Sequence, residues 1–84
     1  MNNSELQQKE MDVCKGLIGI ELDLYDIKDF FTEEQVKTIH DNCYRNMYRY
    51  GLSNEFAVRD AVSSMFLDSE IVVPENYMER FWVA

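Results

Sequence analysis

Turn-forming residues are scarce in this chain, and their scarcity constrains the fold more than any other feature. Only three glycines and one proline occur among its 84 residues. A sheet of many strands needs frequent turns, which glycine and proline usually supply. The sequence therefore favours long uninterrupted elements. We predict an all-α fold, a small antiparallel helical bundle with three main helices and a short C-terminal helix.

The first helix is expected from about residue 4 to residue 31, with Ser4 as a plausible N-cap. Large apolar side chains recur there at steps of three and four, the spacing of one helical face. They are Val13, Leu17, Ile20, Leu24, Ile27 and Phe31. Residues 16–25 also alternate between apolar and polar side chains, as a strand would, and Gly16 and Gly19 each weaken a helix by about 1 kcal/mol. The long stripe favours the helix, and such a stripe ordinarily faces the core.

The later elements have local start and stop signals. Thr32 and Gln35 have the spacing of a capping box, which predicts a second helix through Tyr50, closed by Gly51 in a left-handed conformation. Its inner stripe is expected to be Val36, Ile39, Cys43, Met47 and Tyr50. Ser53 or Asn54 can cap a third helix to about Leu67. Its apolar face is expected to be Val58, Ala61, Val62, Met65 and Phe66.

The C-terminal segment begins with a β-branched run at residues 71–73, which is either a connector or a minor strand. Pro74 suits the first turn of a short last helix, because its missing N–H is not needed there. Tyr77, Met78 and Phe81 would face inward from that helix. Trp82 lies two residues from the end and is either docked on the core or offered to a partner.

Charge separates this chain from nucleic-acid and membrane binders. Sixteen acidic residues oppose eight basic ones, for a net charge of −8. Such a chain repels nucleic acid and anionic membranes and is attracted to basic protein surfaces, although the charge could serve solubility alone.

The 46% hydrophobic content is enough for one domain spanning residues 1–84. The polar N-terminus lacks the features of a signal peptide, so we expect a cytoplasmic protein with Cys14 and Cys43 reduced.

Residues that carry chemistry are sparse, so we do not expect an enzyme. His40 is the only histidine, and no glycine-rich phosphate loop is present. His40, Cys43 and Cys14 with a carboxylate could form a zinc site. Structural zinc sites usually have paired ligands at both corners, however, and only one pair exists here. Two buried thiols are the simpler interpretation, and no metal or cofactor is predicted.

A cluster of carboxylates is the main candidate for a binding site. Its members are Glu21, Asp23, Asp26, Asp29, Glu33 and Glu34. The cluster lacks the central glycine and the register of an EF-hand calcium loop. On one helix it would form a ridge of carboxylates about 5–6 Å apart, comparable to DNA phosphates. A solvated face is the alternative. Arg45, Tyr48 and Arg49 form a second candidate surface, because tyrosine and arginine are enriched at binding hot spots, and Trp82 is the third candidate.

These features predict a non-enzymatic protein-binding module, an inhibitor or regulator whose acidic face blocks a basic surface of a partner, including one that binds nucleic acid. In size and charge the chain resembles phage-encoded inhibitors of bacterial defence, among them anti-restriction and anti-CRISPR proteins. That resemblance rests on no motif and implies mimicry of nucleic acid, not binding to it. The alternative is a structural or assembly subunit that acts through homo-oligomerisation, with a homodimer formed by the apolar stripes of two chains. A metal-dependent switch is a third hypothesis.

Overall fold

The chain forms three α-helices and two short 3₁₀ turns in a computed structural model that describes residues 2–84. Helix α1 spans Asn3–Leu24, α2 spans Glu33–Tyr48 and α3 spans Asn54–Asp68, while the turns η1 and η2 span Lys28–Phe30 and Glu75–Tyr77. Residues 2–84 contain no strand, so the predicted all-α bundle is confirmed. Residues 16–24 are helical, residues 71–73 are a connector, and the short C-terminal helix is a single 3₁₀ turn.

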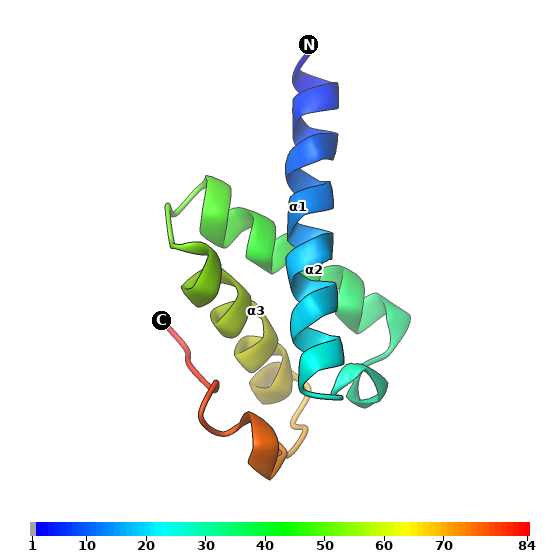
Figure 1. Ribbon diagram of the computed structural model, residues 1–84, viewed down its shortest axis with the longest axis vertical. Helices are drawn as coiled ribbons and strands as arrows, with labels where there is room; N and C mark the ends of the chain where they lie inside the picture. Colours follow the sequence, from blue (N-terminus) through cyan, green and yellow to red (C-terminus); the bar gives the residue numbers. More distant parts are fainter. Residues whose placement is uncertain (1) are drawn as a thin grey trace.

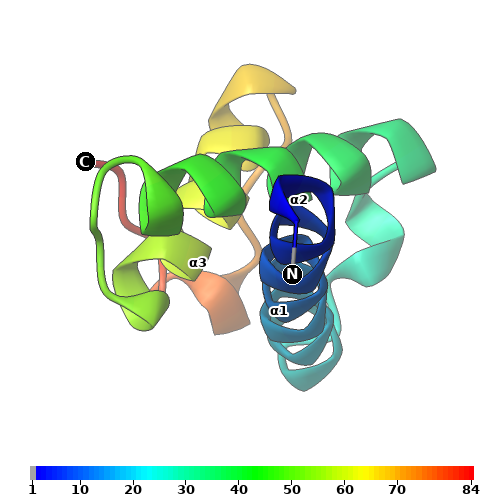
Figure 2. The ribbon, with the colours of Figure 1, turned by 90° about the horizontal axis from the view of Figure 1, so that it is seen from above.

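The three helices cross around one core (Figure 1). Seen from above, α2 passes across α1, and α3 lies on the same side of α1 as the C-terminal segment (Figure 2). The N-terminal half of α1 projects beyond the other two helices (Figure 1). Fully buried side chains from every helix meet in the middle, and Tyr77 of η2 closes the core from the C-terminal segment. All five residues predicted for the apolar face of α3 are buried.

Local capping signals place the starts of α2 and α3 as predicted. The Thr32 hydroxyl accepts from the Gln35 N–H, and the Gln35 side chain accepts from the Thr32 N–H, which completes the capping box. Gly51 has a φ of 69°, in the left-handed region expected of it. Ser53 caps α3 by accepting from the Phe56 N–H. Helix α2 ends at Tyr48 instead of Tyr50, whose side chain is 69% exposed and not part of the inner stripe.

The predicted bounds of α1 are wrong at both ends. The N-cap is Asn2, whose side chain accepts from the Glu5 N–H, and not Ser4. The helix ends at Leu24 because Asp26 takes a left-handed φ of 53°. The Ile27 N–H then donates to the Leu22 carbonyl at 2.9 Å, and the Asp26 N–H to the Asp23 carbonyl at 3.2 Å, which is a Schellman motif. The left-handed residue of this motif is usually glycine. Because Asp26 occupies that position here, the sequence pattern predicts a helix that extends beyond its real end.

The apolar stripe predicted for α1 is largely on the outside. Val13, Ile20 and Leu24 are 47%, 66% and 69% exposed, and Leu17 is half-buried. The buried face of α1 consists instead of Cys14, Ile18, Glu21 and Leu22. Only Ile27 and Phe31, which follow the helix, are buried as the stripe implied. Met78 is likewise 57% exposed instead of facing inward.

Candidate functional site

Five of the six carboxylates predicted as a binding cluster are exposed at one end of the bundle, where α1 ends and α2 begins (Figure 1). They are Asp23, Asp26, Asp29, Glu33 and Glu34. They do not form a ridge on one helix, because α1 ends at Leu24 and Asp29 lies in η1. The predicted ridge with phosphate-like spacing is therefore wrong. The carboxylates surround a junction of three elements instead.

Tertiary contacts bring three more carboxylates to the same end. The Gln35 side chain donates to the Ser69 hydroxyl at 3.0 Å, which places the end of α3 beside the start of α2. The Asn76 side chain donates to the Tyr25 carbonyl at 2.7 Å, which places η2 beside the end of α1. Exposed Asp68, Glu70 and Glu75 thereby join the others. We call the whole set the acidic end: Asp23, Asp26, Asp29, Glu33, Glu34, Asp68, Glu70 and Glu75.

Within residues 2–84, the carboxylates of the acidic end have no cationic partner. The three ion pairs found in residues 2–84 use only Glu21 and Glu55 as their acidic members. Lys28 lies among these carboxylates, and Lys15 and Lys37 line an adjoining groove of about 510 Å³. None of the three lysines forms an ion pair within residues 2–84. The acidic end is therefore free to meet an external cation.

Two of these carboxylates occupy backbone positions that lower the stability of the fold. Asp26 and Glu70 have φ values of 53° and 54°, a left-handed conformation that glycine adopts with less strain. Both follow the C-terminus of a helix, whose partial negative charge disfavours an acidic side chain. Glu70 belongs to a second Schellman motif, in which the Ile71 N–H donates to the Phe66 carbonyl at 2.9 Å. The acidic end thus carries charge at a cost in stability.

Glu21, the sixth predicted carboxylate, is not part of this surface. It is only 6% exposed and accepts from the Tyr77 hydroxyl at 2.8 Å. The two Glu21 carboxylate oxygens also accept hydrogen bonds from Nε and Nη2 of Arg80, each at 3.0 Å. This bidentate ion pair connects the C-terminal segment to α1. Burial and the bond to Glu21 raise the pKa of Tyr77 above its usual range. Glu21 therefore stabilises the fold and is unavailable to a partner.

The tyrosine-arginine surface lies near the opposite end of α2 from the acidic end. Arg45, Tyr48 and Arg49 are all exposed, as a binding surface requires. The rings of Tyr48 and Tyr44 pack with their centroids 5.1 Å apart. The Arg45 guanidinium donates to the Asn42 side chain. With only two arginines, this surface is a smaller candidate than the acidic end.

Trp82 is docked on α3. Its ring is half-buried and lies 4.8 Å from the ring of Phe56, centroid to centroid. Its backbone N–H donates to the Ser63 hydroxyl at 2.9 Å, and the Ala84 N–H donates to Asp60 at 2.9 Å. These bonds hold the C-terminal segment against the bundle. Trp82 is thus mainly a packing residue, with part of its ring left accessible.

The two cysteines considered as zinc ligands lie in the core, whereas His40 is half-buried. Cys14 and Cys43 are completely buried, and each sulfur lies within 3.9 Å of the Met47 sulfur. Burial raises the pKa of Cys43 to about 12, and it raises that of Cys14 as well, so both remain protonated thiols near neutral pH. In the described chain, residues 2–84, no three His, Cys, Asp or Glu side chains form a group that could hold a metal.

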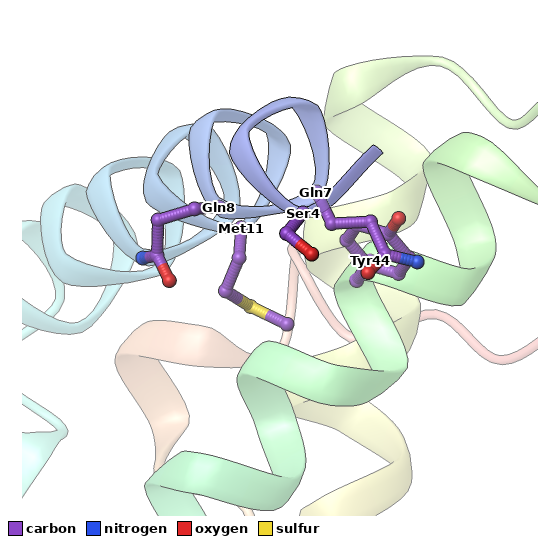
Figure 3. A pocket seen from close by; sticks show the side chains of 5 residues that line it. All are labelled: Ser4, Gln7, Gln8, Met11 and Tyr44. Atoms are coloured by element: carbon purple, nitrogen blue, oxygen red, sulfur yellow. The ribbon is translucent and has the colours of Figure 1, made fainter. Parts of the chain in front are cut away.

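A shallow pocket of about 370 Å³ lies where the projecting part of α1 meets α2 (Figure 3). Ser4, Gln7, Gln8 and Met11 line it from α1, and Tyr44 lines it from α2. None of these five side chains is normally charged at neutral pH. Among the helices of residues 2–84, none combines the length and apolar character needed to cross a membrane.

Comparisons of the chain with models of protein families, with curated proteins and with solved structures find no match.

Proposed function

We propose that this chain is a non-enzymatic protein-binding module, an inhibitor or regulator whose acidic end covers a basic surface of a partner protein. The observation that carries the proposal is the gathering of eight exposed carboxylates at one end of the bundle, none of them in an ion pair with another side chain of residues 2–84. Asp26 and Glu70 strengthen it, because they hold charge in strained positions. A surface kept only for solubility would not need charge at those two sites.

The proposed partner is a protein that binds nucleic acid. Such proteins carry basic grooves that attract phosphates, and an acidic protein can be drawn to the same grooves by long-range attraction. Coverage of the groove would exclude the nucleic acid. In size and charge the chain resembles phage-encoded anti-restriction and anti-CRISPR proteins, so effectors of bacterial defence in the cytoplasm are the partners we propose first.

Competition with DNA tests this proposal. Proteins that bind DNA are purified from the native cell, loaded with fluorescent duplex DNA and titrated with the chain, and release of DNA is followed by anisotropy. We expect release at about 50 mM salt and much weaker release at about 500 mM, because screening shortens the reach of charge to a few ångströms. Absence of release at low salt from every tested protein would refute the proposal.

A matched pair of variants locates the surface. Asp29→Asn with Glu33→Gln removes two charges from the acidic end, whereas Glu5→Gln with Asp41→Asn removes two exposed charges elsewhere. Both variants have the same net charge, and Glu5 and Glu33 both lie in the first turn of a helix. We expect the first variant to raise the concentration needed for release by roughly tenfold and the second to leave it nearly unchanged. Equal effects would show that only overall charge matters.

A further inference from the structure

We propose that two copies of this chain associate through the exposed apolar face of α1, with their helices antiparallel. The face, which we call the α1 stripe, consists of Leu6, Val13, Leu17, Ile20 and Leu24. Four of these side chains are between 47% and 69% exposed, and Leu17 is half-buried. Leu17 packs partly against the core, whereas no element of residues 2–84 covers the other four side chains. The remaining large apolar side chains of α1 are packed into the core.

The spacing of the α1 stripe suits another helix. Its members fall on the a and d positions of a heptad repeat that runs along most of α1, with Glu10 as the polar position. Glu10 accepts from the Tyr44 hydroxyl at 3.3 Å, so its carboxylate is turned toward α2. The N-terminal half of α1 also projects beyond the bundle, where a second helix can approach it (Figure 1).

Gly16 points to a close approach on the flank of the stripe. It lies in the middle of α1, where glycine weakens a helix by about 1 kcal/mol relative to alanine. A Cβ at this position would meet nothing within 4 Å, so packing inside the chain does not require glycine. Gly16 is exposed. A second copy that crosses at Gly16 would explain the residue, because two glycines on a two-fold axis let the helices come close.

Charges on the same flank select a second copy as the partner and fix its direction. Lys9 and Asp23 are exposed, and they lie seven residues before and seven residues after Gly16. When two α1 helices run antiparallel with Gly16 on the axis, Lys9 of each copy lies opposite Asp23 of the other. In the core of the same antiparallel pair, the a positions of one copy face the d positions of the other. Leu17 therefore packs against Val13, and Leu24 packs against Leu6. The surface is thus complementary to itself, and the two acidic ends point in opposite directions.

Sedimentation velocity of the purified chain, with a reducing agent, tests the dimer without any partner protein, so its outcome is independent of the proposed function. We expect a dimer at about 100 μM, a concentration that populates any complex with a Kd below roughly 10⁻⁴ M. Ile20→Gln should abolish the dimer, whereas the control Val72→Gln, at an 86% exposed connector residue, should not. Circular dichroism of both variants checks that the loss of the dimer does not come from unfolding. A monomeric native chain overturns the proposal.

A charge swap tests the direction of the helices. Lys9→Glu alone and Asp23→Lys alone each create two like-charge contacts, and each should raise the Kd of the dimer by roughly tenfold. The double variant Lys9→Glu with Asp23→Lys restores both attractive contacts and should recover the native Kd to within about twofold. A double variant that is weaker than either single variant would overturn the antiparallel arrangement.

Discussion

Removal of the Glu21 carboxylate is expected to destabilise the fold strongly, although Glu21 lies in a sequence of mostly exposed acidic residues. In Glu21→Ala, the fully buried Tyr77 hydroxyl loses its acceptor, which costs about 1–3 kcal/mol. Arg80 loses a bidentate partner, and a broken buried pair costs about 3–5 kcal/mol. That second cost is reduced here, because the Arg80 side chain is 22% exposed and keeps Glu55 at 3.2 Å. We therefore expect a loss of about 3 kcal/mol in all.

Urea denaturation followed by circular dichroism measures this loss. With an m value of about 1 kcal/mol per molar urea, the unfolding midpoint should fall by about 3 M. Asp41→Ala is the control, since Asp41 is exposed on α2 and belongs to none of the ion pairs found in residues 2–84, and its effect should stay within about 0.5 kcal/mol. Equal midpoints for the two variants would refute the structural role of Glu21.

Three further predictions concern local features of the fold. Asp26→Gly should stabilise the chain by about 0.5–1 kcal/mol in thermal unfolding, because glycine adopts the left-handed conformation with less strain. Asp68→Gly, at a helical position, should destabilise the chain by a similar amount. The opposite ranking would contradict the end assigned to α1. Thr32→Ala should cost about 1 kcal/mol in urea by opening the capping box, and no change would mean that this helix start is not stabilised by its cap. The raised pKa of Tyr77 predicts a stability contribution that is complete below about pH 10 and declines above it, because the unfolded tyrosine then loses its proton first; Tyr77→Phe should flatten that alkaline decline in urea midpoints, and an unchanged slope would contradict the burial of its hydroxyl.

Features with local causes were predictable from the sequence. The capping box at Thr32, the left-handed Gly51 and the apolar face of α3 all follow from residues a few positions apart. The buried face of α1 was not predictable in this way, because the helix has two apolar stripes of helical spacing. Only contact with α2 and α3 selects which of the two stripes is buried. The stripe of Met11, Cys14, Ile18 and Leu22 was visible in the sequence, but its side chains are no larger than those of the exposed stripe.

The binding surface was predictable only in part, for a similar reason. The cluster from Asp23 to Glu34 is contiguous in sequence, whereas Asp68, Glu70 and Glu75 reach it through the fold. Glu21 was misassigned because its partner Arg80 lies 59 positions later in the chain. No local pattern distinguishes a buried, paired carboxylate from its exposed neighbours.

An amide chemical-shift map tests directly whether the acidic end is the surface that meets a basic partner. The ¹⁵N-labelled chain is titrated, at low salt and low concentration, with the protein that releases DNA most readily in the competition assay. We expect the largest chemical-shift changes at residues 23–34, 68–70 and 75. Changes centred on Arg45, Tyr48 and Arg49, or on Trp82, with the acidic end unaffected, would contradict it.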